Sequence, residues 1–395
     1  MSRVVLAYSG GLDTSVTIRW LADHGYEVHA VAVDVGQQED FSLVRERGER
    51  AGAASVRVVD AVERFAAEFL TKAIRANGLY EGKYPMVSGL ARPCIAEEVV
   101  RVARELGASS VAHGCTGKGN DQMRFEVSFA VLAPDLEIVA PIRDAGIPRE
   151  KALTMASEWG IPVADVVSTY SVDENLWGRT TECGPLEDPW AAPPEDAFGR
   201  TAGPLDRRSQ PVEVVVTFES GLPLALDGGA TPLPALIRVL DELGGSYGFG
   251  RIDMVENRRV GIKSRELYEA PGALAIIEAH RALEDLTLER EVAHHKPQLE
   301  QRWADLVYGG QWFGPLRQAI DAYVGSTQTH VSGDVRLRFE PGTCTVVGTR
   351  SPFSLYDLSL ATYGGGDAFD QSDARGYVRL AGLPLKVWAE KQGRP

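Results

Sequence analysis

Roughly the first 140 residues alternate short apolar runs with amphipathic segments, and this order restricts the fold more than any other feature of the chain. VVLAY (4–8) is a strand-like run that ends at glycines, SVTIRWLADHG (15–25) has helical periodicity, and EVHAVAVDVG (27–36) is a second strand-like run. Strand, helix and strand in this order predict a βαβ unit.

The same order returns further along the chain. A helix is predicted over 95–108, a strand over 109–114 that runs into a glycine-rich loop, and another strand over 136–142. The sequence therefore predicts an α/β fold with a doubly wound, mostly parallel sheet. Ligands of such sheets bind where strands end and loops begin.

The pattern changes near residue 165. The stretch 171–202 is rich in Trp, Pro and Gly, has no clear period, and is predicted to be an ordered connector or an active-site loop. A hairpin is predicted over 211–229. A helix is predicted over about 232–243, with Thr231 as its N-cap and Pro232 in its first position.

A long helical region covers roughly 273–324, with breaks predicted at Pro297 and around 309–315. A second hairpin is predicted over 335–348, turning at Pro341-Gly342. Because domains usually have roughly 100–200 residues, a chain of 395 residues is expected to form two domains.

Composition limits the partners and the compartment. With 41 basic and 55 acidic side chains the formal charge is −14, which argues against broad binding of nucleic acid or anionic membranes. Cys94, Cys115, Cys183 and Cys344 form no CxxC pair and are expected to be buried, reduced thiols. No apolar run reaches the roughly 18 residues of a membrane span, and the N-terminus does not resemble a signal peptide, so the expected location is the cytoplasm.

AYSGGLDTS (7–15) follows the first strand-like run and has the composition of a phosphate-binding loop. Ser9 and the glycines after it let backbone N–H groups approach an anion, and Thr14 and Ser15 open a helix whose N-terminus attracts negative charge. The loop is neither GxGxxG nor a P-loop ending in GK[ST], and its charged residue is a carboxylate, Asp13. The alternative is an ordinary strand–helix turn capped by Asp13 or Thr14.

No metal site and no covalent nucleophile are predicted. His294 and His295 are adjacent on a helical pattern, so they point about 100° apart, and no third ligand lies at metal-binding spacing. They are expected on a solvated face. The sequence has no GxSxG or Cys/His signature of a nucleophile.

Eight stretches identify a family resemblance: AYSGGLDTS, ARPCIAEE, AHGCTGKGNDQMRFE, YSVDENLWGR, LEDPW, GFGRIDMVENRRVGIKSRELYEAPG, LTLERE and LVYGGQWFGPLR. The first resembles the pyrophosphate loop of the N-type ATP pyrophosphatases, which cut ATP between the α and β phosphates. The chain from residue 3 to about 380 resembles the argininosuccinate synthases.

The resemblance implies a reaction and a domain plan. Citrulline, aspartate and ATP would give argininosuccinate, AMP and pyrophosphate in arginine biosynthesis, with magnesium required. A Rossmann-like ATP-binding domain would cover 1–165, an α+β synthetase and multimerisation domain 166–360, and a C-terminal oligomerisation tail 361–395. The family also implies a homotetramer.

The resemblance assigns residues to each substrate. Those assigned to ATP are Ala7, Tyr8, Ser9, Gly10, Gly11, Leu12, Asp13, Thr14, Ser15, Val33 and Gly114. Those assigned to aspartate are Thr116, Asn120 and Asp121. Those assigned to citrulline are Tyr84, Gly89, Asn120, Arg124, Ser171, Thr180, Glu256 and Tyr268.

The side chains of the loop 113–125 suit an amino-acid substrate. The Asn120 amide can hold a carboxylate, Asp121 can hold an ammonium group, and Arg124 can clamp a carboxylate with two parallel hydrogen bonds. Glu256 is the anionic candidate for the citrulline ammonium. Without the family, the loop would be interpreted as a flexible turn after a strand.

Two residues are candidates for catalysis. We hypothesise that Asp13 caps the helix and faces magnesium through water, because a bound cation inverts the local charge logic. Lys118 is a candidate for stabilising charge around the α-phosphate. Transfer of AMP to the ureido oxygen would give citrullyl-AMP, and the aspartate amine would displace AMP, so no protein nucleophile is needed. No general base is identified.

This sequence departs from the family at three positions. Gly89 stands where the family often has a serine that contacts citrulline, although Ser88 is adjacent. Thr180 stands where serine is common, and Val33 where alanine is common near the adenine.

Three other functions are alternatives for a chain with such a loop. An amidotransferase such as asparagine synthetase or GMP synthetase needs a catalytic cysteine or an ammonia source, and residue 2 is Ser. A tRNA-thiolating enzyme calls for a basic surface and reactive cysteines. A non-catalytic nucleotide-binding module needs only the first domain.

Overall fold

The computed structural model describes residues 1–161, 169–364 and 367–393. It divides into two compact units, Met1–Phe353 and Ser354–Pro395. The predicted domain boundary after residue 165 lies outside the described residues. No helix in the described part of the chain has the length and apolar character needed to cross a bilayer.

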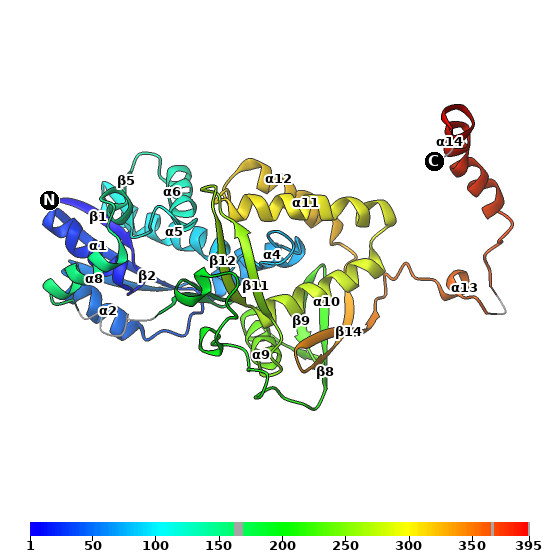
Figure 1. Ribbon diagram of the computed structural model, residues 1–395, viewed down its shortest axis with the longest axis horizontal. Coiled ribbons are helices and arrows are strands. Elements are labelled where there is room, and N and C mark those ends of the chain that lie inside the picture. The colour runs from blue at the N-terminus through cyan, green and yellow to red at the C-terminus, as the bar shows by residue number, and fades with distance from the viewer. Residues whose placement is uncertain (162–168, 365–366, 394–395) are drawn as a thin grey trace. The chain divides into compact units, whose positions relative to one another are not determined.

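Five parallel strands form the N-terminal sheet of the first unit (Figure 1). Their order is β3-β2-β1-β4-β5, and their bounds are β1 Ser2–Ala7, β2 Tyr26–Asp34, β3 Ser55–Asp60, β4 Ser110–His113 and β5 Glu137–Val139. The strand order reverses between β1 and β4, which is where open α/β sheets bind ligands. This confirms the predicted doubly wound, parallel sheet.

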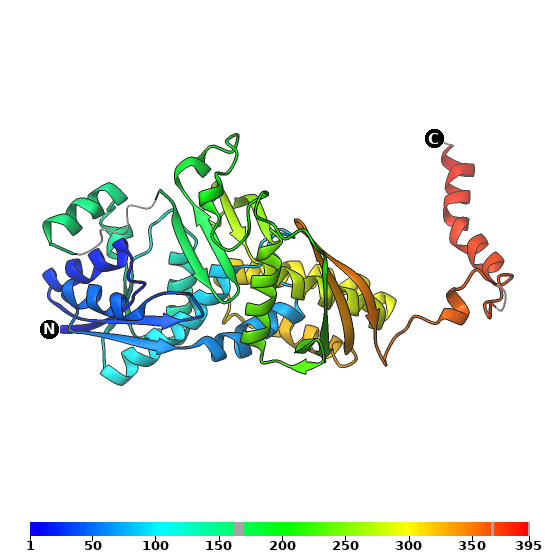
Figure 2. The ribbon, with the colours of Figure 1, turned by 90° about the horizontal axis from the view of Figure 1, so that it is seen from below.

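Helices cover both faces of this sheet (Figure 2). Along β1, Val4 and Leu6 face one core cluster and Val5 and Ala7 face the other, because successive strand residues point to opposite sides. The helices of the first face are α1 Leu12–Asp23, α2 Phe41–Arg50, α7 Pro141–Asp144 and α8 Arg149–Glu158. Those of the second are α5 Val87–Leu106 and α6 Asp121–Leu132.

Helix α5 begins eight residues before the predicted start at 95, so it includes Pro93. Proline removes one backbone donor inside a helix. The preceding turns nevertheless bury Val87, Leu90 and Ala91 completely. Burial of this apolar face outweighs the local preference against proline. Three short helical segments lead from β3 to α5: α3 Val62–Arg64, a π-helical turn Phe65–Leu70 and α4 Thr71–Arg75.

A four-stranded antiparallel sheet follows in the sequence, with the order β11-β12-β7-β6. Its strands are β6 Ser171–Asn175, β7 Gly178–Glu182, β11 Arg251–Asn257 and β12 Lys263–Glu269. The first part of 171–202, predicted to be an ordered connector or an active-site loop, is therefore a hairpin of β6 and β7. Both strands are mainly polar and so have no apolar period, and Thr180 of β7 pairs in turn with Tyr268 of β12. Further along, 3₁₀ turns occur at Gly184–Glu187 and Glu195–Ala197.

The third sheet, β10-β9-β8-β13-β14, contains both predicted hairpins. Its strands are β8 Val212–Glu219, β9 Leu222–Leu226, β10 Gly229–Ala230, β13 Gly333–Glu340 and β14 Thr343–Arg350. The hairpin of β13 and β14 turns between Glu340 and Thr343, as predicted for Pro341-Gly342.

Four long helices complete the first unit: α9 Leu233–Ser246, α10 Pro271–Thr287, α11 Arg290–Tyr308 and α12 Pro315–Thr327. The predicted cap of α9 is wrong, because Pro232 is the N-cap and the Thr231 hydroxyl donates to the carbonyl of Gly229 at 2.8 Å. The break predicted over 309–315 is confirmed by the end of α11 and the start of α12.

The break predicted at Pro297 is wrong, because α11 continues through it. The chain breaks earlier, where the Glu289 carboxylate caps α11 by accepting the N–H of Glu291 at 2.9 Å. Beside the proline, the buried Lys296 contacts Glu284 of α10 at 2.9 Å. This ion pair holds α11 against α10 at the residue before Pro297, where the helix continues.

One large core cluster extends through the first unit. It contains Val5 and Val31 of the parallel sheet, Leu90 of α5, Trp303 of α11 and Phe339 of β13. The two halves of the unit therefore share a core.

The cysteines differ in exposure. Cys94 is buried as predicted, Cys115 and Cys344 are half-buried, and Cys183 is exposed, contrary to the expectation. Cys183 follows β7 in a turn with φ +75°, so its side chain is not part of the sheet's packed face.

The second unit contains α13 Leu358–Ala361 and α14 Ala374–Gln392. No residue of α14 is buried. Its exposed apolar side chains are Tyr377, Val378, Leu380, Leu383, Leu385, Val387 and Trp388.

Candidate active site

A cavity of about 680 Å³ lies at the carboxyl ends of β1, β2 and β4. Its remaining walls come from α5, α6 and the antiparallel sheet of β6, β7, β11 and β12. The cavity therefore collects residues from both halves of the first unit.

The AYSGGLDTS loop joins β1 to α1 and depends on one glycine in particular. Gly10 has φ +75°, a conformation that L side chains rarely adopt, and a Cβ there would lie 3.0 Å from Cγ2 of Val44. Helix α1 begins at Leu12, and the N–H groups of its first turn have no intrahelical acceptor. The loop thus presents a helix N-terminus to the cavity, which favours an anion.

Neither Asp13 nor Thr14 is the N-cap, so the predicted capping is wrong. Gly11 is the N-cap and makes no side-chain capping bond. Thr14 instead ties the loop together, since its hydroxyl lies 3.1 Å from Ser9 Oγ and donates to the carbonyl of Gly11 at 3.3 Å. Asp13 lines the cavity, where burial raises the pKa of its carboxyl and the Arg149 cation opposes that rise.

The second glycine loop packs directly on the first. A Cβ on Gly114, just after β4, would lie 3.0 Å from Cγ2 of Thr14 and 3.1 Å from Oγ1 of Thr17. A Cβ here would require Thr14 or Thr17 to shift by a few tenths of an ångström, and glycine avoids this. Because β1 and β4 are neighbours in the sheet, both loops reach the same cavity.

Polar contacts hold the second loop in shape. His113 is buried, and its Nδ1 accepts the N–H of Cys115 at 3.2 Å, so Nε2 carries the proton and faces Glu126 at 3.1 Å. The Gln122 amide donates to the carbonyls of Gly117 at 2.7 Å and Gly119 at 3.2 Å. The backbone of the loop is thereby fixed before any substrate binds.

Most of the residues assigned from the sequence line this one cavity, and three do not. Ser15 points into the core, with its hydroxyl 3.2 Å from that of Tyr8. Gly89 lies inside α5, where a Cβ would be 3.7 Å from Nε of Arg124. Lys118 is exposed, and its carbonyl accepts Nη1 of Arg258 at 3.3 Å.

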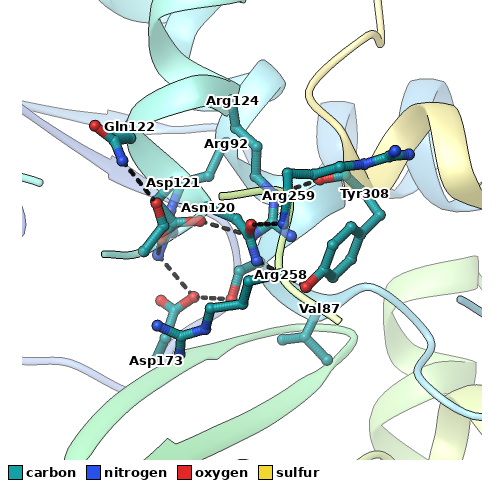
Figure 3. Close-up of polar contacts among 12 residues, drawn as sticks. Val87, Arg92, Asn120, Asp121, Gln122, Arg124, Asp173, Arg258, Arg259 and Tyr308 are labelled. Carbon is teal, nitrogen blue, oxygen red and sulfur yellow. Dashed lines mark hydrogen bonds and ion pairs between the residues drawn. The ribbon is translucent and has the colours of Figure 1, made fainter. Parts of the chain in front are cut away.

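Arg92 and Arg124 surround Asp121 at the start of α6 (Figure 3). Arg92 Nε donates to Oδ2 at 2.9 Å, and Arg124 Nη1 donates to Oδ1 at 2.7 Å. These two cations outweigh burial and lower the pKa of Asp121 to about 2. Arg92 also donates to Asp173 of β6 at 2.7 Å, so it joins the two halves of the site.

Glu256 is a buried carboxylate, 1% exposed, that accepts the hydroxyls of Tyr268 at 2.7 Å and Tyr308 at 2.6 Å. Burial, followed by the nearby Glu266, raises its pKa to about 7. The Tyr268 hydroxyl also lies 2.9 Å from Glu266, so its single proton faces two carboxylates. This group of side chains is suited to a cation.

Two more features complete this wall. The ring of Tyr84 stacks on that of Tyr268 with centroids 3.9 Å apart. Thr180 lines the cavity, and its buried hydroxyl is among the side-chain atoms without a hydrogen-bond partner in the described part of the chain. The ring of Tyr84 presents a flat surface to a ligand, and the hydroxyl of Thr180 presents a hydrogen-bonding group.

Several residues of the site were missed from the sequence. They are Arg92, Asp173, Arg258, Glu266 and Tyr308. All stand in stretches that carry the family resemblance, but charge and position in the sequence did not distinguish them from ordinary ion-paired residues. Their contacts across long sequence separations identify them.

The described residues include no group of three or more His, Cys, Asp or Glu side chains placed to hold a metal ion. Asp13 is a single carboxylate beside the anion-binding loop. That arrangement fits a Mg²⁺ ion that arrives with a nucleotide, because Mg²⁺ is usually bound by one or two carboxylates, several waters and the substrate phosphates.

Two family models match the chain. The argininosuccinate synthase N-terminal HUP domain matches residues 3–162, and the C-terminal domain of the same family matches residues 170–388. A solved 4-thiouridine synthetase in complex with RNA and ATP is 16% identical, with a TM-score of 0.32 over 42% of each chain, and a likeness this small carries no argument.

Curated relatives match over almost the whole chain. Argininosuccinate synthase of Bacillus licheniformis is 52% identical over 98% of this chain and 96% of its own length. The Geobacillus kaustophilus enzyme is 52% identical over 98% and 95%, and that of Bacillus subtilis 51% identical over 98% and 96%. Two matching family models and these full-length relatives establish that the chain belongs to the argininosuccinate synthase family.

Proposed function

We propose that this protein joins citrulline to aspartate with ATP, giving argininosuccinate, AMP and pyrophosphate in arginine biosynthesis. One observation carries the proposal: a single cavity is lined by both the anion-binding loop of β1 and α1 and the buried Glu256 group. A nucleotide and an amino acid can therefore meet in one site.

ATP is proposed to bind at the ends of β1, β2 and β4. The loop residues Ser9 to Thr14 would hold its phosphates through backbone N–H groups, with Gly114 close beside them. Val33 at the end of β2 would lie against the adenine. Magnesium is proposed to enter as part of the substrate, with Asp13 facing it through water.

Citrulline is proposed to bind along the Glu256 wall. Glu256 would hold the ammonium group, Arg124 the carboxylate, and Thr180 and Ser171 the neutral ureido group. The unpartnered hydroxyl of Thr180 supports this, since a buried polar atom without a partner is costly until a ligand supplies one.

Aspartate is proposed to bind at the loop 114–121, near Thr116, Asn120 and Asp121. In this structure both oxygens of Asp121 already accept hydrogen bonds from arginines. A carboxylate has about four lone-pair sites, so Asp121 can accept an ammonium as well. The neighbouring Arg92, which pairs with Asp121 and Asp173, would be the closest guanidinium to a substrate carboxylate there.

The proposed chemistry needs positioning and charge stabilisation rather than a protein nucleophile. The ureido oxygen of citrulline attacks the α-phosphorus of ATP, the bond to the β,γ-pyrophosphate breaks, and citrullyl-AMP forms. The aspartate amine then attacks the ureido carbon, AMP leaves with its oxygen, and the amine loses a proton. The catalytic role of Lys118 stays a prediction, because its side chain is exposed outside the cavity lining.

Three further expectations belong to the proposal. They are a cytoplasmic location, a homotetramer, and the domain limits 1–165, 166–360 and 361–395. The exposed apolar row of α14 supports association with other copies, because monomers rarely leave such patches bare.

Product analysis tests the function. The protein is incubated with ATP, magnesium, citrulline and aspartate, and each component is left out in turn. AMP and pyrophosphate formed only with both amino acids would support the proposal, and ATP–pyrophosphate exchange with citrulline alone would support the adenylate. Formation of ADP would contradict it, and absence of any turnover would favour the binding-module alternative.

A further inference from the structure

The hydroxyl of Tyr308 lies behind the cavity wall, between two residues assigned to the substrates. It donates to Oε1 of Glu256 at 2.6 Å. It also accepts a hydrogen bond from Nδ2 of Asn120 at 2.7 Å (Figure 3). Tyr308 is fully buried and is not among the residues that line the cavity. Any effect of its hydroxyl on substrates therefore acts through Asn120 and Glu256.

The direction of these hydrogen bonds is determined by their partners. Oδ1 of Asn120 accepts the backbone N–H of Arg259 at 3.1 Å, which orients the amide so that its NH₂ group faces Tyr308. The phenol oxygen must then accept from Asn120, and its single proton is left for Glu256. One hydroxyl thus sets the orientation of the amide and the hydrogen bonding of the carboxylate together.

The rest of Tyr308 is held rigidly. Its ring stacks on that of Tyr80, with centroids 3.6 Å apart and planes 4° apart. The guanidinium of Arg124 lies 5.0 Å from the ring centre, and Arg124 Nε donates to the carbonyl of Tyr308 at 3.1 Å. Three residues assigned to citrulline or aspartate therefore contact this one side chain or its backbone.

The second of the two glycines that follow Tyr308 lets the chain at the end of α11 approach α6 closely. Gly310 has φ +71°, and a Cβ on it would lie 2.9 Å from Cα of Arg124. The Tyr-Gly-Gly sequence at the end of α11 is thereby explained, since it brings the helix end against the first turn of α6.

We propose that Tyr308 is a positioning residue that couples the citrulline and aspartate sites, because its single hydroxyl binds the Glu256 carboxylate and holds the Asn120 amide in one orientation. The proposal rests on the proposed function. It predicts that removing the oxygen of Tyr308 weakens the binding of both citrulline and aspartate and leaves the binding of ATP unchanged.

Removal of this hydroxyl also has a defined electrostatic consequence. Burial and then Glu266 raise the pKa of Glu256, whereas the Tyr308 and Tyr268 hydroxyls lower it. Without the Tyr308 donor, the pKa of Glu256 rises further. The other titratable or charged groups that face it are Arg124, Arg258, Tyr84 and Tyr80.

The test compares Tyr308→Phe with Tyr80→Phe. The first keeps the ring, the stacking and the Arg124 contact, and loses only the oxygen. The second is the matched control, because Tyr80 is the stacking partner and its hydroxyl donates to the carbonyl of Asn257 rather than to a substrate residue. Steady-state rates of argininosuccinate formation are measured from about pH 6 to pH 9 with each substrate varied.

For Tyr308→Phe we expect the KM for citrulline at pH 7 to rise about tenfold, as for loss of one charge-assisted hydrogen bond. The pH at which citrulline KM doubles should move upward, and the KM for aspartate should rise several-fold. The KM for ATP should not change. Tyr80→Phe should leave the pH dependence in place.

Two outcomes separate this inference from the proposed function. If the wild type forms argininosuccinate and Tyr308→Phe has the same KM values and pH dependence, the coupling role is wrong while the function stands. If the wild type forms none, the function is wrong and the inference falls with it.

A second variant covers the case in which Tyr308→Phe does not fold. Site-specific 3-fluorotyrosine at 308 keeps the size and makes the phenol more acidic, hence a stronger donor. It should move the pH dependence of citrulline KM downward, opposite to Tyr308→Phe. An unchanged pH dependence would overturn the proposal.

Discussion

Nε of Arg92 donates a hydrogen bond to Oδ2 of Asp121 at 2.9 Å, joining the second turn of α5 to the first residue of α6. Arg124 adds a second contact to the same carboxylate. Together they lower the pKa of Asp121 to about 2, against about 3.9 for an unfolded chain. The ionised form of Asp121 therefore stabilises the folded state.

Asp121→Asn tests this linkage in the absence of substrates. A carboxyl whose folded pKa is depressed stabilises the fold above its unfolded pKa, and this contribution is lost as pH falls through the folded pKa. We expect the variant to lose about 2 kcal/mol of unfolding free energy at pH 7. The difference from wild type should shrink between about pH 4 and pH 2. Urea titrations at several pH values measure it, with the exposed Asp23→Asn as control, and a difference independent of pH would contradict it.

Glu256→Gln should abolish the binding of the citrulline ammonium. The KM for citrulline is expected to rise roughly 100-fold, since loss of a buried charge pair costs about 3 kcal/mol. Because the pKa of Glu256 is about 7, wild-type citrulline KM should rise as the pH falls below about 7 and the carboxylate is protonated. The variant should lack this dependence. Retention of the same pH profile in Glu256→Gln would show that another group is responsible.

Asp13→Asn addresses the metal. The variant keeps the size of the side chain and loses its charge, so we expect the magnesium concentration for half-maximal rate to rise about tenfold. Asp40→Asn is the control, because Asp40 caps α2 outside the cavity lining and asparagine caps equally well. Full activity with normal magnesium dependence in Asp13→Asn would contradict the role given to this carboxylate.

Gly89→Ser restores the residue common in the family. A Cβ at 89 meets Met86 at 3.4 Å and Arg124 at 3.7 Å, which are ordinary contacts, so stability should change by less than about 1 kcal/mol. Since Gly89 does not line the cavity, citrulline KM should change by less than about threefold. At the control position, Gly178, a Cβ would lie 2.8 Å from the carbonyl of Glu269, and serine should destabilise by about 2 kcal/mol. A tenfold fall in citrulline KM for Gly89→Ser would mean that a serine at this position contacts citrulline directly, and that this chain lacks that contact.

The parallel sheet was predictable because its signals are local. Each strand of the βαβ unit is a short apolar run ending at glycine, and the helices have their own period. The hairpin of β6 and β7 was not, because SVDEN and GRTTE are mainly polar and the Leu176-Trp177 turn between them has none of the usual turn residues. At Pro297 a local rule gave the wrong break, because the buried contact of Lys296 with Glu284 overrides it.

The residues of the candidate site also divide into those that could be predicted from the sequence and those that could not. Most of the residues that line the cavity could be assigned because they stand in rare stretches that resemble a family. The residues behind them could not. Asn120 and Tyr308 are separated by 188 positions, and nothing in the local sequence of either indicates the other. Asp13 could be placed at the loop, but its role as a cap was wrong, since that depends on where the helix starts.

The core shared by Val5, Leu90, Trp303 and Phe339 limits how such a chain can be taken apart. A cut between the two family modules, after residue 162, would leave α5 on the parallel sheet but separate it from β6, β7 and α11, which pack against it, and would divide the shared core. The N-terminal half thus cannot be transferred to another protein on its own without exposing part of its core. Exchanging it between relatives should succeed only when the buried residues of both halves are transplanted together, so the two modules are expected to have changed in step.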